Sequence, residues 1–170
     1  MTKVNLCGAG LKDFINIDAS WKADKTVNLN RRKIPMKDNS VDVLICMSAI
    51  GYFTKERGEF LIRDVHRILK YGGVCRFGTQ DLELICENFL ANDPDFKCER
   101  INEWFNGYEA SGHKSKYVYD EITLLKLFIN SGFDMSNIFC MPYQESADLT
   151  VKLGQYDNRS EQMFFIEAVK

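Results

Sequence analysis

An apolar segment that runs directly into a glycine-rich turn constrains this chain more than any other stretch. The sequence Val-Asn-Leu-Cys-Gly-Ala-Gly occupies residues 4–10, and a second apolar segment, residues 14–18, ends on Asp18. Glycines let a backbone approach a ligand closely, and a carboxylate at a strand end can accept hydrogen bonds from ribose hydroxyls. Gly8 and Gly10 could also form only a tight turn, and Asp18 could be only a strand-end cap. The stretch therefore favours, without proving, a nucleoside site in an α/β fold.

Composition limits the function classes. With 170 residues the chain is expected to form one domain, and its formal charge of −2 argues against a nucleic-acid partner held by bulk electrostatics. No run approaches the roughly 20 apolar residues of a membrane span, and the first residues lack the apolar region of a signal peptide. We therefore expect a cytoplasmic protein with no membrane partner.

The six cysteines show no metal-binding spacing. None forms a CxxC pair or has a histidine at zinc-finger spacing, so we expect no metal site. Reduced cysteines inside apolar strands behave as small hydrophobic residues. We expect this core-packing role for four of them: Cys7, Cys46, Cys75 and Cys140.

Hydrophobic patterning predicts alternating strands and helices. The almost continuously apolar residues 41–47 are typical of a central parallel strand that is buried on both faces. Thr54 is suited to cap a helix over residues 54–70, which Gly72-Gly73 is expected to end. The further predicted strands are 4–7, 14–18, 26–30, 74–79, 137–143 and 162–169; the further helices are 82–91 and one from Asp120 to before Gly132.

Two features of this pattern are unusual. Only about seven residues separate each of the first three strands from the next, whereas a parallel crossover normally takes a dozen or more. Either these crossovers are single turns, which we favour, or the early part of the sheet is abbreviated. Residues 92–116 lack clear periodicity, and an irregular stretch of that length usually forms a functional loop or lid. Within a single domain spanning 1–170, we assign residues 1–81 to a cofactor-binding half and residues 92–119 to a substrate-side loop.

Several motifs in the correct order resemble those of small class I S-adenosylmethionine-dependent methyltransferases. Pro35, Asp38, Ser40 and Asp42 match a P-x-x-D-x-S-x-D motif before the fourth strand, and residues 67–73 match R-x-L-K-P-G-G with Tyr71 in place of proline. The likeness covers roughly residues 4–140. It implies a Rossmann-like fold: a mostly parallel twisted sheet with an antiparallel C-terminal strand, helices on both faces, and an abbreviated N-terminal part.

The resemblance also implies a cofactor, S-adenosyl-L-methionine, and the residues that hold it. The opening segment departs from the family pattern in three ways: Cys7 stands at the usual first glycine, Asn5 stands at the usual acid of the first strand, and the glycine spacing is shifted by one. The implied cofactor-binding residues are Cys7, Gly8, Ala9, Gly10, Asp18, Asn28, Leu29, Ser48, Ala49 and Ile50.

Methyl transfer from a sulfonium needs alignment more than a reactive side chain, because positioning alone can lower a barrier by about 7–11 kcal/mol. A nucleophile that must lose a proton still needs a base, and His113 is the candidate. A solvated His113 and an ordinary packing role for the nearby aromatic residues are the alternatives. The aromatic candidates for the substrate wall are Tyr52, Trp104, Tyr108, Tyr117 and Tyr119.

The leading hypothesis is a methyltransferase acting on an oxygen or nitrogen of a small-molecule or sugar-type acceptor. A catalytically degenerate protein that still binds the cofactor is the alternative, suggested by Cys7 and the missing strand-one acid. A nicotinamide-dependent oxidoreductase is disfavoured, because no GxGxxG turn opens a full helix. The sequence leaves open whether the chain forms a homodimer.

Overall fold

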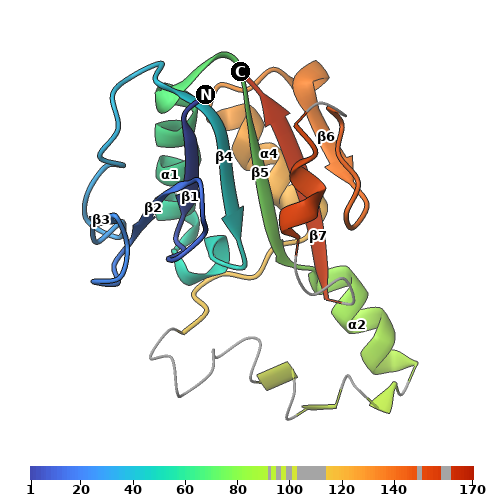
Figure 1. The fold of residues 1–170 in the computed structure, drawn as a ribbon. Coiled ribbons are helices and arrows are strands. Elements are labelled where there is room, and N and C mark those ends of the chain that lie inside the picture. Colours follow the sequence, from blue (N-terminus) through green and yellow to red (C-terminus); the bar gives the residue numbers. More distant parts are fainter. Residues whose placement is uncertain (92, 95–96, 99–100, 103–113, 149–150, 158–161) are drawn as a thin grey trace.

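The structure, a computed structural model, describes residues 1–170 except 92, 95–96, 99–100, 103–113, 149–150 and 158–161. Its centre is a seven-stranded sheet with the order β3-β2-β1-β4-β5-β7-β6 (Figure 1). The strands are β1 (Lys3–Leu6), β2 (Ile15–Asp18), β3 (Lys25–Thr26), β4 (Val41–Met47), β5 (Leu69–Gln80), β6 (Ile138–Met141) and β7 (Met163–Val169).

The first five strands are parallel, and β7 runs antiparallel to both of its neighbours, β5 and β6. The loop at residues 7–14 joins β1 to β2 without a helix, as the short spacing predicted. β3 is shorter than predicted, because the carbonyl of Asn28 accepts the amides of Arg31 (3.0 Å) and Arg32 (3.1 Å) and so turns the chain. Asn28 and Leu29 therefore lie in a loop beyond the strand.

The described α-helices are α1 (Lys55–Ile68), α2 (Leu82–Leu90) and α4 (Glu121–Asn130). Thr54 caps α1 as predicted, its side chain accepting the amide of Arg57. The helix ends at Ile68 rather than at the glycine pair, since Leu69 is already extended and pairs with Val41. Gly72, at φ +75°, instead belongs to an irregular part of β5.

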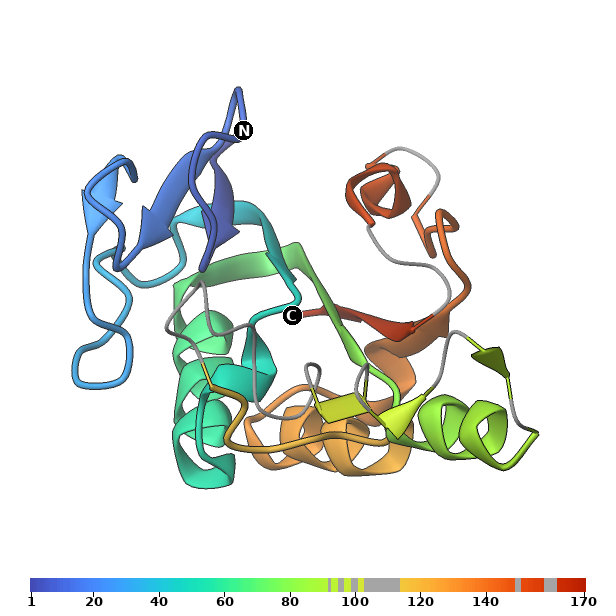
Figure 2. The same ribbon diagram turned by 90° about the horizontal axis from the view of Figure 1, so that it is seen from below.

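The helices divide unequally between the faces of the sheet. Figure 2 shows α1 and α4 on one face and the short 3-10 helix η5 (Leu153–Tyr156) on the other. The larger core lies under α1 and α4, whereas the η5 face holds a small apolar cluster of Phe14, Val43, Ile45, Val74 and Leu153. The second face carries less helix than expected because the short connections between β1, β2 and β3 hold none.

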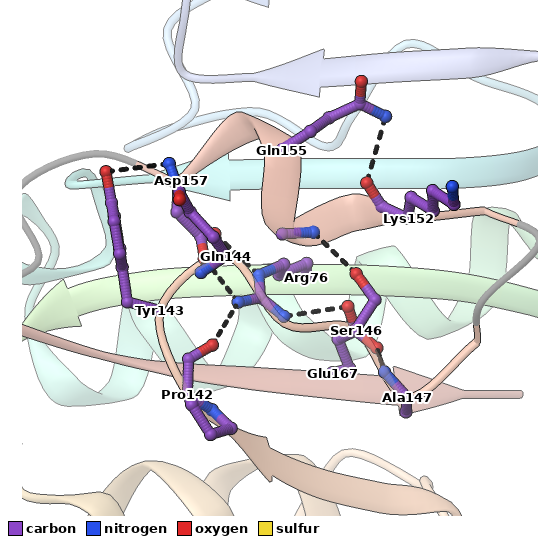
Figure 3. Close-up of polar contacts among 11 residues, drawn as sticks. Arg76, Pro142, Tyr143, Gln144, Ser146, Ala147, Lys152, Gln155, Asp157 and Glu167 are labelled. Atoms are coloured by element: carbon purple, nitrogen blue, oxygen red, sulfur yellow. Dashed lines mark hydrogen bonds and ion pairs between the residues drawn. The ribbon is translucent and has the colours of Figure 1, made fainter.

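A buried ionic cluster joins the η5 region to the sheet (Figure 3). Arg76 of β5 is 0% exposed and binds Asp157 with two nitrogens (Nε–Oδ1 2.7 Å, Nη2–Oδ2 2.5 Å) and Glu167 of β7 with a third (Nη1–Oε1 2.8 Å). The carboxylates also accept the amides of Gln144 and Ala147. The cluster therefore fixes the connection between β6 and β7.

The cysteines divide by position. Cys46 and Cys75 are buried in the core as expected, and Cys7 is half-buried. Cys140 is exposed, contrary to the prediction, because β6 is the edge strand and its burial is incomplete. No helix in the described part of the chain is long and apolar enough to cross a membrane.

Candidate functional site

A cleft opens at the carboxyl ends of β1, β2 and β4. The strand order reverses here, because β2 and β3 lie on one side of β1 whereas β4 and β5 lie on the other. Ligands of open α/β sheets bind at such a switch point. The cleft encloses about 610 Å³ of empty space, part of it open to solvent. Its lining residues are Cys7, Asp18, Ala19, Val27, Asn28, Leu29, Asn30, Met47, Ser48, Ala49, Tyr52 and Phe53.

The opening turn leaves β1 through a left-handed residue. Cys7 has φ 60° while its amide donates to the carbonyl of Ile17 (2.8 Å). A Cβ on Gly8 would lie 2.6 Å from the Asn5 side chain, so this position has room only for glycine unless Asn5 moves. Within the described residues, no hydrogen bond occupies the amides of Gly8, Ala9 and Gly10. These amides are available to a ligand.

A network of side-chain amides supports this turn. Asn5 Nδ2 donates to Asn16 Oδ1 (2.9 Å), which also accepts the amide of Leu11 (3.0 Å). Asp24 Oδ2 in turn accepts the backbone amide (2.8 Å) and the side-chain amide (2.9 Å) of Asn16. Hydrogen bonds from Asn16 lower the pKa of the Asp24 carboxyl. Asn5, which replaces the usual acid, thus has a defined role in shaping the loop.

Asp18 closes β2 at the cleft. One carboxylate oxygen accepts the amide of Ser20 (2.7 Å), and the other has no hydrogen-bond partner among the described residues. The neighbouring loop is held from α1, because Arg57 Nε donates to the carbonyl of Leu29 (2.6 Å) and Arg57 Nη2 donates to the carbonyl of Arg32. The site therefore offers an open carboxylate oxygen beside a fixed loop.

The far side of the cleft follows β4. Ser48 is a second left-handed residue, at φ 56°, and its amide donates to the carbonyl of Gly78 (2.9 Å). The carbonyl of Gly51 accepts the amides of Lys116 (2.8 Å) and Tyr117 (3.2 Å), which brings this later segment beside Tyr52. Non-glycine residues at positive φ are uncommon and concentrate at functional sites.

The structure brings together most, but not all, of the predicted site residues. The predicted substrate residue Tyr52 lines the cleft. Six predicted cofactor residues line it too: Cys7, Asp18, Asn28, Leu29, Ser48 and Ala49. Gly8, Ala9 and Gly10 follow Cys7 in the opening turn. Tyr117 lies at the rim, next to Tyr52. Trp104, Tyr108 and His113 lie outside the described residues.

Two predicted residues are corrected. Ile50 is 0% exposed and belongs to the core, so it does not line the cleft. Tyr119 is also 0% exposed, packed against α1 near Gly58 and beside the Tyr117 ring (centroids 4.8 Å apart), so it does not face an acceptor. Both residues lie in apolar stretches, and the sequence alone does not show whether such a residue packs in the core or lines the cleft.

Sequence reasoning also missed five lining residues, each of them next to a predicted one. The local signal was therefore present, since extending each predicted motif by one residue on either side would have found all five. The missed residues are Ala19, Val27, Asn30, Met47 and Phe53.

The geometry fits a methionine nucleoside. Free backbone amides at the turn suit its methionine part, the open Asp18 oxygen suits ribose hydroxyls, and Leu29 and Val27 give an apolar wall for the base. In the described part of the chain no group of three His, Cys, Asp or Glu side chains could hold a metal ion.

Comparisons with known proteins agree with this geometry. Residues 9–77 match the family model described as methyltransferase domain. An S-adenosylmethionine-dependent methyltransferase from Mesorhizobium loti is 18% identical, with a TM-score of 0.61, 99% of this chain and 90% of that chain being covered. One from Archaeoglobus fulgidus is 14% identical, with a TM-score of 0.61 and coverages of 99% and 86%. The chain therefore has the fold of S-adenosylmethionine-dependent methyltransferases, and residues 9–77 carry a methyltransferase-domain signature.

One further solved structure is similar to this chain, and one comparison found no match. The complex between the Haloferax volcanii Trm112 methyltransferase activator and a putative methyltransferase contains a 12% identical chain, with a TM-score of 0.59 and coverages of 99% of this chain and 81% of that one. No curated protein matches the sequence. The matched residues 9–77 contain Asp18, Asn28 and Ser48 of the cleft.

Proposed function

We propose that this chain is an S-adenosylmethionine-dependent methyltransferase, which moves a methyl group to an oxygen or nitrogen of a small-molecule or sugar-type acceptor. The observation that carries the proposal is the meeting of three separate segments in one cleft: the turn after β1, the end of β2 with its following loop, and the end of β4. Six of the residues that the family resemblance implied for the cofactor line the cleft on these segments.

The chain's own residues have distinct roles in this proposal. The amides of Gly8 and Gly10 hold the methionine part, Asp18 accepts the ribose hydroxyls, and the loop at Asn28 and Leu29 lies along the adenine. When bound, S-adenosylmethionine supplies an electrophilic methyl group on a sulfonium leaving group. The protein aligns the acceptor with that methyl group and excludes water, and such alignment can lower the barrier by about 7–11 kcal/mol.

The acceptor lies beyond Ser48, where Tyr52 and Tyr117 form one wall. In this arrangement residues 1–81 form the cofactor half and residues 92–119 the acceptor side. His113, which lies outside the described residues, is the proposed general base. Asn5, one of the two features behind the degenerate alternative, supports the opening turn through its hydrogen bond to Asn16.

Calorimetry with S-adenosylhomocysteine (SAH), the product form of the cofactor, tests the site. Asp18→Ala removes the ribose acceptor and should weaken SAH binding by about tenfold or more, as expected for a lost charge-assisted hydrogen bond. Asp134→Ala, an exposed carboxylate far along the chain, is the control. Unchanged SAH affinity in Asp18→Ala, or binding of NAD in place of SAH, would overturn the cofactor site.

A methyl-transfer assay tests the reaction itself. Neutral and charged sugars and small amines are offered with labelled cofactor, and transfer of label identifies the acceptor atom. Transfer to an acceptor carbon would contradict the proposed oxygen or nitrogen chemistry.

A further inference from the structure

Five positively charged residues lie on the segments that surround the mouth of the cleft, and the side chains of three of them, Lys55, Arg57 and Lys116, contact residues of the cleft or its rim. Arg31 and Arg32 follow directly on the lining residues, their amides bound to the carbonyl of Asn28. Arg57 binds the carbonyl of Leu29. The remaining two belong to the acceptor side and are Lys55 and Lys116.

These two lysines come from segments far apart in the sequence. Lys116 Nζ lies 3.3 Å from Oδ1 of the lining residue Asn30, and its backbone amide binds the carbonyl of Gly51. Lys55 Nζ lies 5.9 Å from the centre of the Tyr117 ring, which is itself bound to Gly51. The lysines therefore flank the acceptor side of the mouth. We call the five cations, Arg31, Arg32, Lys55, Arg57 and Lys116, the rim cations.

The rim cations are not neutralised by the protein. Within the described residues none of the five forms an ion pair, whereas Arg63, Arg67, Lys70 and Arg76 each do. Arg57 binds backbone carbonyls, and the carboxylate charge that acts on it belongs to Asp64, which is itself paired with Arg67. Three carboxylates accompany the five cations: Asp18 in the cleft, Glu56 in the first turn of α1, whose charge interacts with that of Lys55, and Asp64 beside Arg57. The mouth is thus positive although the whole chain carries a formal charge of −2.

The cofactor does not supply the missing negative charge on this side. The ribose and adenine that Asp18 and the loop from Asn28 would hold are uncharged, and S-adenosylmethionine carries a net positive charge through its sulfonium. Positive groups concentrated at a cleft attract and orient anionic ligands. The anion that these side chains can receive therefore has to come from the second substrate.

We propose that the acceptor is a small molecule bearing a phosphate group, which the rim cations bind while its methyl-accepting atom lies at Ser48. This inference rests on the proposed function and narrows its acceptor class. Two lysines from separate segments and neighbouring arginines suit a doubly charged group with several acceptor oxygens.

The test uses matched pairs of probes on the SAH-bound protein: glucose with glucose 6-phosphate, and uridine with uridine monophosphate. Calorimetry should show the phosphorylated member binding about tenfold or more tightly than its neutral twin, with a preference that shrinks at high salt. The double variant Lys55→Met with Lys116→Met should lose most of that preference. Lys126→Met with Lys152→Met, which removes two exposed lysines away from the cleft, should keep it.

The outcomes separate this inference from the proposed function. Bound SAH with no phosphate preference, or an equal loss in both double variants, would overturn the phosphate-bearing acceptor and leave the cofactor site intact. Absence of SAH binding would instead overturn the proposed function. A short single-stranded RNA that binds far more tightly than any small probe would overturn the small-molecule acceptor in favour of nucleic acid.

Discussion

Single residues in left-handed conformations shape the cleft. Cys7 and Ser48 lie at the ends of β1 and β4, both with φ near 60°, and each amide is bound to a carbonyl of the neighbouring strand. The cost of this conformation for a non-glycine residue is about 1–3 kcal/mol. The sheet hydrogen bonds offset that cost and direct the chain out of the sheet at the place where a ligand would lie.

Asp24→Asn tests the support of the opening turn. The variant keeps the size of the side chain but loses the negative charge that binds Asn16, so we expect a lower Tm and weaker SAH binding. Hydrogen bonds from Asn16 lower the folded-state pKa of Asp24, so the stabilisation is fully present above the unfolded value near 3.8 and is lost as the pH falls through the lowered folded value.

Thermal unfolding of wild type and variant across pH checks this prediction. The difference in Tm should stay constant from neutral pH down to about 5 and shrink in stronger acid. A difference that already disappears near pH 6 would show that another group is responsible.

Tyr119 carries a buried hydroxyl that finds no hydrogen-bond partner within the described residues. Burial raises the pKa of this phenol, so it stays neutral. Tyr119→Phe removes the unsatisfied group and should raise the free energy of unfolding by about 1 kcal/mol, measured by urea denaturation. A marked loss of stability in Tyr119→Phe would mean that the hydroxyl has a stabilising partner.

Gly58 provides an independent check on the same contact. A Cβ at Gly58 would lie 2.7 Å from the Tyr119 hydroxyl, so Gly58→Ala should destabilise the wild type. The loss should be smaller in the Tyr119→Phe background, because the clashing oxygen is absent there. A double-mutant cycle measures this coupling, and strict additivity would contradict the contact.

At the scale of elements, α1 holds the loop that follows β3. Arg57→Met removes the hydrogen bonds to the carbonyls of Leu29 and Arg32, and the loosened loop should weaken SAH binding by about fivefold. Arg63→Met on the same helix is the matched control and should leave the affinity unchanged, because among the described residues the Arg63 side chain pairs with Glu59 alone. Equal effects of the two substitutions would point to helix stability rather than loop position.

At the scale of the whole molecule, the buried cluster of Figure 3 ties three distant parts of the chain together. Arg76→Met leaves Asp157 and Glu167 as uncompensated buried carboxylates and should lower the free energy of unfolding by about 3–5 kcal/mol. Replacing Asp157 and Glu167 by leucine in the same protein should recover most of that loss, because a fully apolar cluster has no unpaired charge. Urea denaturation measures both, and a triple variant no more stable than Arg76→Met would contradict this account.

The sequence predicted well those features that depend on neighbours along the chain. The buried strand at 41–47, the Thr54 cap and the parallel single-turn crossovers follow from local apolar patterning, side-chain chemistry and connection length. The boundary of α1 was predicted two residues late, because Leu69 pairs with Val41 in the sheet. The glycine pair indicates that the helix must have ended before it. It does not indicate that pairing with a strand distant in sequence ends the helix earlier.

By itself, then, the sequence determined an α/β fold whose opening turn, strand-end carboxylate and strand-four motif stand in the order of a methyltransferase. Only the tertiary structure decided that Ile50 and Tyr119 lie in the core, that Asn5 and Asp24 support the turn through Asn16, and that the rim cations meet at one mouth. The physical reason is that helix and strand periodicity and turn chemistry depend on residues close together in the sequence. Whether a side chain is buried, or lies near another charge, depends on contacts between distant residues, such as Arg76 and Asp157, which are 81 residues apart.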